Sequence, residues 1–462
     1  MALEIIVVPL IVALACALPI GTFARPLAVL SGLIVAGVVG ARLWLGAGVI
    51  PPDATLSLAL DADGFSSVLL VLTGVLFAVG AAASTGLRSP RAYFALWSLL
   101  QVAVSGVFLA RDLVLFFVFW EAMLIPLALL LWHWGGSDRR AATYRFLLYT
   151  MAGSALLLVG IVALGVGAKT FSFAGLTGYR LSESSQVAFA LLFLAAFVVK
   201  LPLFPFHGWL PRAYAAAPLP VALVLSGVVA KTAAYGIARI CVTLFPLGMA
   251  DLAPGLVALA VVGVLYGALV ATRQRDTRGL IAFSSLSHLN LIGLAAFIGT
   301  TDAARGVLIA SVSHGLIVAA LFLLAGMLER RVGSFGFGPG GLGVRAPVLV
   351  AFWTFAIMAT IGVPTTAGFA GEFLVLAATY VRFPGAGLVA TLVVVVAAVY
   401  GLTFLRAVVF GPPSDAPHDD LGWRERALVL PLLILILIVG IVPRAITDAV
   451  GAVPGAEPAI IR

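Results

Sequence analysis

Six ionisable residues lie inside long apolar stretches of the sequence. An ionisable side chain in the middle of a membrane costs at least ~2.5–3.5 kcal/mol on insertion scales, and residues kept there usually line ion pathways. Carboxylates, lysines and histidines can all take up and release protons, so a series of them suits proton movement. The candidate proton-translocation residues are Glu121, Lys200, Lys231, His288, His314 and Glu372.

Burial disfavours the charged form of a lysine or glutamate, whereas an opposite charge nearby favours it. Glu121 beside a lysine would therefore titrate as a coupled pair, and a change of pairing would let the lysine release or capture a proton. Hydroxyl groups that could hold water lie close to the candidates in the sequence. They belong to Thr232, Tyr235, Ser284, Ser285, Ser287, Ser311, Ser313, Thr365 and Thr366.

A purely structural role is the alternative at each position. A buried glutamate–lysine pair can simply hold two helices together, and a neutral histidine can be a satisfied donor in the core. His207 lies at a proline-rich interruption and could cap freed backbone groups. His133, at the end of an apolar run, and His418, in a loop, show no feature that suggests function.

The composition predicts that these residues lie in a membrane. Of 462 residues, 63% are hydrophobic and 10% are charged, and the mean hydropathy is +1.19. A soluble domain carries about 25% charged residues, and disordered chains are poor in apolar residues, so both classes are excluded. The net charge of +8 comes from arginines near the ends of apolar runs, which indicates membrane topology rather than nucleic-acid binding.

Several cofactor sites are excluded by missing motifs. The two cysteines, Cys16 and Cys241, lie in apolar runs, and the sequence has no CxxC or Cys/His cluster, so cysteine cannot build an iron–sulfur or zinc site. The sequence has no Walker loop and no strand–GxGxxG–helix unit. The N-terminus lacks a basic region and a cleavage site, and is interpreted as a retained first span.

Apolar runs of roughly 20 residues are long enough to cross ~30 Å of hydrocarbon as helices. We predict an all-α, polytopic membrane protein with about fourteen transmembrane helices. They are expected near 3–21, 25–46, 64–85, 92–110, 112–133, 142–167, 186–204, 218–243, 253–272, 279–299, 304–328, 346–380, 386–408 and 427–447.

Basic residues predict the orientation. They gather in loops after odd-numbered spans, at Arg88, Arg139, Arg273 and Arg330 among others. The positive-inside rule places these loops in the cytoplasm, so both termini are expected on the outer side. Usage rich in Arg, Ala, Gly and Val and poor in Lys suggests a bacterium, and therefore its inner membrane.

Prolines interrupt two of the spans. One interruption follows Lys200 and contains Pro202, Pro205 and Pro211, and the other contains Pro364 and precedes Glu372. Pro202 and Pro364 are 162 positions apart, which suggests a repeat of five spans. An odd number of spans per unit makes the second unit inverted, an arrangement common in ion pathways; two ordinary kinks are the alternative. The predicted units are 1–91, 92–243, 253–408 and 427–462.

Seven segments together resemble the antiporter-like proton-channel subunits of respiratory complex I over nearly the whole chain. They are FFVFWEAMLIP (116–126), RFLLYTMAGS (145–154), KLPLFPFHGWLP (200–211), LSGVVAKTAAYGIAR (225–239), GLIAFSSLSHLNLIGL (279–294), SHGLIVAALFLLAG (313–326) and GFAGEFLVL (368–376). Glu372 favours the M type, because L and N types usually carry lysine there. The lack of a long lateral helix after span fourteen argues against the L type.

The resemblance implies roles for the candidates. Glu121 and Lys200 would match the family's glutamate–lysine pair, and Lys231 the lysine that passes protons toward the centre. His288 and His314 would lie on the central axis, and Glu372 would end the outward half-channel. Departures from the pattern after the first interruption put one polar inlet in doubt: Arg212, Tyr214 and Leu219 replace an acid, a histidine and a threonine.

The resemblance also implies a setting. The chain would carry no cofactor, and FMN, iron–sulfur clusters and quinone would bind to partner subunits. Its partners would be the L and N types, the small membrane subunits and the lipid bilayer, with no nucleic acid. A subunit of a multisubunit sodium/proton antiporter or a membrane-bound hydrogenase is an alternative. A stand-alone solute carrier, which predicts a solute-sized pocket at the interruptions, is another.

Overall fold

A computed structural model describes residues 2–18, 22–45, 60–334, 336–337, 341–410 and 419–450. Within these ranges the chain is helical, with three isolated β-bridges. The predicted ends of spans one and two near 19–21 and 46, His418 and the tail 451–462 lie outside the described residues. The helices are α1 (Ala2–Ala17), α2 (Ala24–Trp44), α3 (Gly64–Ala83), α4 (Pro90–Leu109), α5 (Leu113–Ala122), α6 (Leu124–Trp134), α7 (Arg139–Ala168), α8 (Phe173–Thr177), α9 (Glu183–Lys200), α10 (Leu210–Ala216), α11 (Leu219–Val224), α12 (Lys231–Gly236), α13 (Val242–Leu244), α14 (Pro246–Ala271), α15 (Thr277–Ala296), α16 (Thr301–Val332), α17 (Leu342–Arg345), α18 (Pro347–Thr360), α19 (Ala367–Arg382), α20 (Pro384–Val409), α21 (Trp423–Ile441) and α22 (Arg444–Thr447).

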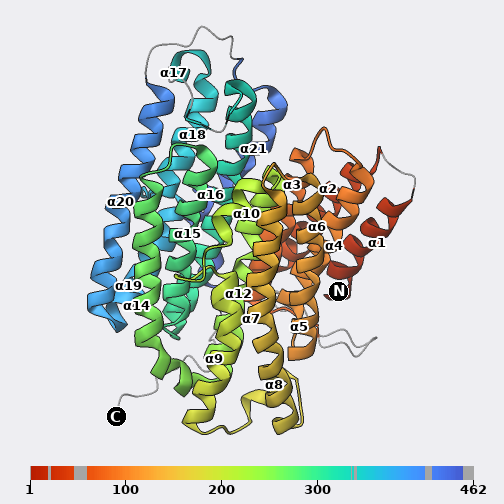
Figure 1. Ribbon diagram of the computed structural model, residues 1–462, viewed down its shortest axis with the longest axis vertical. Helices are drawn as coiled ribbons and strands as arrows, with labels where there is room; N and C mark the ends of the chain where they lie inside the picture. The colour runs from red at the N-terminus through yellow and green to blue at the C-terminus, as the bar shows by residue number, and fades with distance from the viewer. Residues whose placement is uncertain are drawn as a thin grey trace.

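The helices form one bundle whose two ends are marked in Figure 1 by α17 and by α8. Among the described residues, eleven helices are long and apolar enough to cross a membrane, and α1 and α18 are shorter apolar helices. With α1, α21 and the pair α18–α19, they account for the fourteen predicted spans. The polytopic all-α prediction is therefore confirmed, whereas the repeat boundaries stay a prediction.

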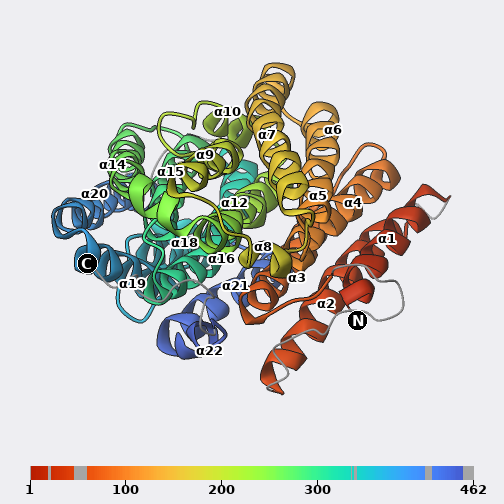
Figure 2. The same ribbon diagram turned by 90° about the horizontal axis from the view of Figure 1, so that it is seen from below.

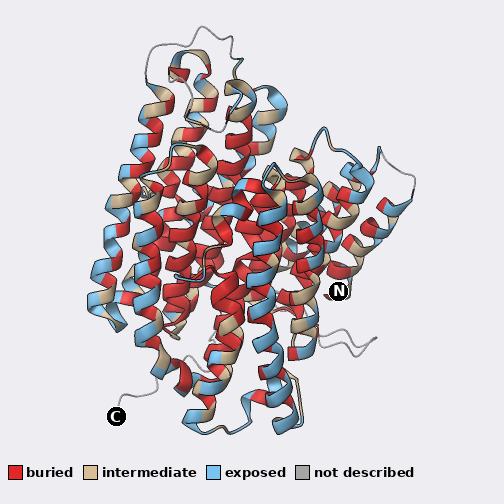
Figure 3. Cartoon of the chain, in the orientation of Figure 1, coloured by how far each residue is buried: buried red, intermediate tan, exposed pale blue. Residues whose placement is uncertain are grey.

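The outer helices present apolar side chains to the surroundings. On α20, Leu388, Leu392, Val395 and Val399 are 52–68% exposed, at the spacing of one helix face. Figure 3 shows exposed positions along α7, α14 and α20 and buried positions in the middle of the bundle. This pattern is expected where the solvent around the bundle is lipid.

Helix α16 lies at the centre of the bundle. Its apolar window is fully buried, and it contacts α3, α11, α15, α18, α19 and α21 (Figure 2). Gly306, Gly315 and Gly326 lie on it among alanines and serines, so neighbouring backbones can approach closely. His314 lies in the middle of this helix, and its position is fixed from every side.

Both proline-rich interruptions are real breaks in the helices. Residues 201–209 separate α9 from α10, and residues 361–366 separate α18 from α19. A third irregularity was not predicted: two π-helical segments, η1 (Leu225–Val229) and η2 (Ile237–Cys241), flank α12. π-Helical turns are rare and often mark functional sites.

An ion cluster fixes α21 against α16 at the α17 end. The Glu425 carboxylate accepts from Arg331 Nη2 at 2.6 Å and from Arg330 Nη2 at 2.8 Å. Burial opposes the charge of Glu425, but these bonds and the Gly422 N–H outweigh it and lower its pKa to about 2. Because the folded-state pKa is lowered, the stabilisation is present above about pH 4 and is lost as the pH falls toward 2.

We expect Glu425→Gln to destabilise the protein by about 1–3 kcal/mol, because both guanidinium groups lose a charged acceptor. A thermal-unfolding assay of the purified protein should show a lower Tm, with the same difference at about pH 5.5 and about pH 8. Glu183→Gln, at an exposed carboxylate in the first turn of α9, is the control. An unchanged Tm for Glu425→Gln would mean that the cluster contributes nothing to stability.

Candidate functional site

Lys231 is the first residue of α12 and is completely buried. Its ammonium group donates to the Ser226 carbonyl oxygen at 2.6 Å, and its Nζ lies 2.5 Å from Nδ1 of His314. Ser226 belongs to η1, where the i→i+5 pattern of the π-helix changes which carbonyl groups are taken up within the helix. The irregular segment thus supplies a backbone acceptor for the lysine, and α16 supplies the histidine.

The line of ionisable groups continues from His314 to Glu372. The rings of His314 and His288 lie with centroids 5.8 Å apart, and His288 Nδ1 lies 3.5 Å from Oε1 of Glu372. Glu372 is 7% exposed. Four of the six predicted residues, from α12, α16, α15 and α19, therefore form one line, in which His288 is partly buried and the other three are buried. α15 and α16 are consecutive, whereas α12 and α19 come from distant parts of the sequence and pack around them.

A small cavity lies along this line. It has a volume of about 20 Å³ and is bordered by His288, Ser313, His314, Thr360 and Glu372 among others. A cavity of ~10–15 Å³ is sufficient for one water molecule. Nε2 of His288 and Nε2 of His314 are buried without a protein partner, so a water here would have polar groups to bind. The arrangement is suited to passing protons over short distances, and the cavity is too small for an organic solute.

The second break positions Glu372. Gly362 has φ +70°, and a Cβ at this position would lie 2.4 Å from Oε2 of Glu372. The break therefore needs glycine twice over, for its backbone conformation and for the space that the carboxylate occupies. Thr365 also has a positive φ, of 76°.

We expect Gly362→Ala to displace the Glu372 carboxylate and reduce proton translocation by about tenfold or more, since misplacement of ~1 Å can cost 10²-fold. Proton uptake by vesicles that contain the assembled protein would measure the loss. Gly333→Ala is a matched control, because Gly333 also has a positive φ, of 78°, but a Cβ there meets nothing within 4 Å. Equal effects of the two substitutions would attribute the loss to backbone strain alone.

The first break is capped by residues that sequence reasoning did not identify. Asn290 donates from Nδ2 to the Pro202 carbonyl oxygen at 3.1 Å, and its Oδ1 accepts from the Phe204 N–H at 3.2 Å. Trp209 Nε1 donates to the Val199 carbonyl oxygen at 2.8 Å. His207 instead stacks on Phe204 and packs at an angle against Tyr266, and its Nδ1 has no partner. The capping role considered for His207 thus falls to Asn290 and Trp209. Asn290 is a lone asparagine inside the apolar run 279–294, and this was the signal that could have identified it as a capping residue.

Lys200 lies at the C-terminal end of α9 and is 1% exposed. Its ammonium group lies over the Trp120 ring, 3.6 Å from the centroid, and makes no hydrogen bond. Trp120 is itself fixed by a hydrogen bond from Nε1 to Ser154 Oγ at 3.1 Å. Such a cation–π contact contributes about 2 kcal/mol or more in a desolvated site.

The glutamate–lysine pair implied by the resemblance is more distant than an ion pair. Within the described part of the chain, Glu121 and Lys200 form no salt bridge, and the Lys200 ammonium group makes no hydrogen bond. Oε1 of Glu121 is buried without a partner. Trp120, the neighbour of Glu121, is therefore the direct partner of Lys200 in this conformation. The aromatic residue was visible in the motif FFVFWEAMLIP, but its partner could not be inferred from the sequence.

The three departures from the family pattern lie around α10. Arg212 Nη1 lies 3.8 Å from Oδ2 of Asp138, and both side chains are about half exposed. Tyr214 is fully buried, with its ring 5.8 Å from that of Phe322. Leu219 lies against Gly326. Apolar and aromatic packing thus occupies two of the three positions, and Tyr214 lies close to Ser226, whose carbonyl oxygen accepts from Lys231.

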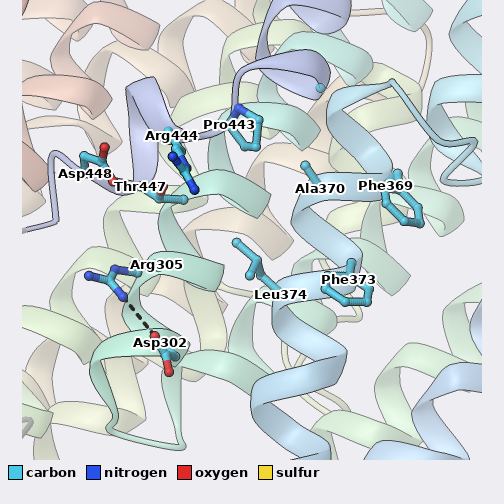
Figure 4. A pocket seen from close by; sticks show the side chains of 11 residues that line it. Asp302, Arg305, Phe369, Ala370, Phe373, Leu374, Pro443, Arg444, Thr447 and Asp448 are labelled. Carbon is cyan, nitrogen blue, oxygen red and sulfur yellow. Dashed lines mark hydrogen bonds and ion pairs between the residues drawn. The ribbon is translucent and has the colours of Figure 1, made fainter.

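A larger pocket lies beside the second break, at the α8 end. It has a volume of about 620 Å³ and lies between the start of α16, α19 and the α21–α22 corner. Figure 4 shows Asp302, Arg305, Arg444 and Asp448 on one side of it and Phe369 and Phe373 on the other. None of the six candidate residues lines it. Within the described residues there is also no group of three or more His, Cys, Asp or Glu that could hold a metal ion.

Known proteins are similar to this chain over most of its length. Residues 110–399 match the family described as "NADH:quinone oxidoreductase/Mrp antiporter, TM". The chain is 37% identical over 409 residues to NADH-quinone oxidoreductase subunit M of Pseudomonas aeruginosa, covering 85% of this chain and 80% of that one. It is 36% identical over 416 residues to subunit M of Escherichia coli, covering 86% and 82%.

Two solved structures share the fold. A chain of respiratory complex I from Thermus thermophilus superimposes with a TM-score of 0.89 at 30% identity, covering 97% of this chain and 98% of that one. A chain of the Mrp complex from Dietzia superimposes with a TM-score of 0.86 at 23% identity, covering 99% and 98%. The second likeness shows the fold alone.

Proposed function

Because the chain belongs to the family of membrane subunits shared by NADH:quinone oxidoreductases and Mrp antiporters, we propose that it is the M-type proton-translocating subunit of an NADH:quinone oxidoreductase. The observation that supports this most is the buried line from Lys231 through His314 and His288 to Glu372. It joins the irregular helix around α12 to the break before α19.

In this proposal the line carries protons and no electrons. Lys231 passes its proton to His314, to which it is already hydrogen-bonded, and the cavity water and His288 connect His314 to Glu372. Glu121 and Lys200 act before Lys231. Movement of charge in a neighbouring subunit would change the charge state of Lys200 and so start the series of proton transfers.

The proposed function implies a setting. FMN, iron–sulfur clusters and quinone would be held by partner subunits, and the L-type, N-type and small membrane subunits would flank this chain in a bacterial inner membrane. The α8 end, at which α21 ends and α22 lies, would face outward, together with both termini. Glu372 favours this assignment over a subunit of an Mrp antiporter.

The proposal is tested by purifying the chain in mild detergent from its native membrane and identifying the subunits that accompany it. We expect NADH-binding, flavin and iron–sulfur subunits, and proton uptake into reconstituted vesicles when NADH and a quinone are added. Accompanying subunits limited to other antiporter-like chains, with no NADH oxidation, would contradict the proposal and favour the Mrp alternative. Function as a single chain would contradict both.

A further inference from the structure

A second ion cluster lies at the α8 end, on the helix that carries Lys231. Its members are Asp61, Asp63, Ser66, Arg111, Tyr235 and Arg239, and we call it the Arg111 cluster. Arg111 donates to the Asp61 carboxylate and, at 3.2 Å, to the Tyr235 hydroxyl. Arg239 Nη1 lies 2.6 Å from Asp63 Oδ2, and Arg111 Nη2 lies 3.7 Å from Asp63 Oδ1.

The cluster is placed by backbone contacts at the α8 end of the bundle. Asp112 pairs with Ser172 in an isolated bridge, and the Phe173 N–H donates to the Arg111 carbonyl oxygen at 2.9 Å. Asp63 is the N-cap of α3 and accepts from the Ser66 N–H at 2.9 Å. The cluster therefore joins the starts of α3 and α5 to Tyr235 of α12 and Arg239 of η2. We call the continuous segment formed by η1, α12 and η2 the Lys231 helix.

Tyr235 connects the cluster to Lys231. The two residues are four positions apart on α12, so they lie on the same face, one turn apart. The hydroxyl of Tyr235 contacts Ser66 Oγ at 3.1 Å and the Phe108 carbonyl oxygen at 3.3 Å. Its ring packs against Phe65 and Phe108, at centroid distances of 6.0 and 5.3 Å. Tyr235 is 1% exposed, so its side chain is buried between Lys231 and the ion pairs of the cluster.

The chemistry of the cluster suits a barrier better than a proton path. A path needs groups that both accept and release protons, whereas the guanidinium of Arg111 only donates and stays charged. Two carboxylates balance two guanidinium groups, and the polar atoms are bonded to each other. The line from Lys231 to Glu372 differs in this respect, because Nε2 of both histidines is left without a protein partner. Although burial opposes the charge of Asp63, Arg239, Arg111 and Ser66 outweigh it and hold its pKa below the usual value.

We propose that the Arg111 cluster is a barrier that closes the α8 end of the Lys231 helix to protons, so that a proton on Lys231 leaves toward His314. The guanidinium of Arg111 has no lone pair that could accept a proton, and it keeps its own protons, so it interrupts proton transfer on this side of Lys231. The inference rests on the proposed function, in which Lys231 carries a proton that must not escape toward the α8 end.

The test measures passive proton leak through the purified complex in sealed vesicles, with a pH gradient and no NADH. Arg111→Gln should raise the leak several-fold over wild type, because it removes the charge and the bond to Tyr235. The same preparation should pump fewer protons per NADH oxidised. Arg305→Gln is the matched control, since Arg305 is a second arginine at the α8 end, paired with Asp302 at 3.0 Å and away from α12.

The double variant Arg111→Gln/Lys231→Ala separates this inference from the proposed function. If the leak passes through Lys231, the double variant should return to the wild-type leak rate. A leak rate equal to wild type in Arg111→Gln would overturn the proposal that the cluster is a barrier. This holds whatever the pumping assay of Lys231→Ala shows. Lost pumping without leak would also overturn it, because the cluster would then belong to the path. Should Arg111→Gln fail to assemble, Tyr235→Phe removes only the hydroxyl, and a wild-type leak in that variant would overturn the barrier as well.

Discussion

Lys231→Ala is expected to abolish NADH-driven proton translocation by this subunit while the complex still assembles. The alanine removes the only basic group of α12, to which His314 is hydrogen-bonded. Loss of a positioned proton donor or acceptor costs typically 10²–10⁴-fold. Proton uptake by vesicles, compared with NADH oxidation in the same sample, measures the effect.

Two further variants make this prediction specific. Lys231→Arg keeps a positive charge but cannot release its proton, so it should pump as poorly as Lys231→Ala if Lys231 carries protons. Rescue by arginine would mean that only a fixed charge is needed. Lys169→Ala is the control, because Lys169 is an exposed lysine at the end of α7. Pumping by Lys231→Ala at the wild-type proton-to-electron ratio would refute the assignment.

Glu372→Gln should have an effect of similar size for a different reason. Glutamine has nearly the shape of glutamate and can still bond to Nδ1 of His288, so the break and α19 should keep their structure. It cannot take up a proton, so the end of the line becomes inactive. We expect the rate of proton translocation to fall to about one tenth of the wild-type rate or below. The amount of assembled complex should be unchanged.

The comparison with Glu372→Asp tests whether proton exchange is the property that matters. Aspartate can still exchange a proton but holds its carboxyl about 1.5 Å farther from His288, so pumping should be partly retained. Glu183→Gln, at an exposed acid, should behave as wild type. If Glu372→Gln pumps at the wild-type rate, the exit of protons does not pass through this residue.

Much of the site could be predicted because ionisable residues are rare in apolar spans, where their insertion into the membrane is costly, so those that occur stand out from the sequence around them. Four of the six candidate residues lie on one line, and both proline-rich interruptions separate helices. What could not be predicted depends on contacts between spans. The partner of Lys200 is the Trp120 ring, and the break after Lys200 is capped by Asn290 from another helix. Neither contact leaves a pattern in the local sequence.

The same limit applies to the fold. Hydropathy indicated the spans but not the two π-helical segments around α12, since a change from i→i+4 to i→i+5 bonding does not alter composition. Span fourteen was predicted over 427–447, whereas α21 covers Trp423–Ile441. The polar residues Arg424, Glu425 and Arg426 lie in its first turns, and Pro443 follows its end, where proline disfavours continuation.

The complete burial of α16 has a mechanical consequence for turnover. A helix with one lipid-facing side can slide or rotate at the cost of contacts on its other sides only, but α16 is packed all around. Displacing it would disturb α3, α11, α15, α18, α19 and α21 together. We therefore expect His314 to keep its place during turnover, and changes of distance along the line to come from the parts with irregular backbones: η1 next to Lys231, and residues 361–366 before Glu372.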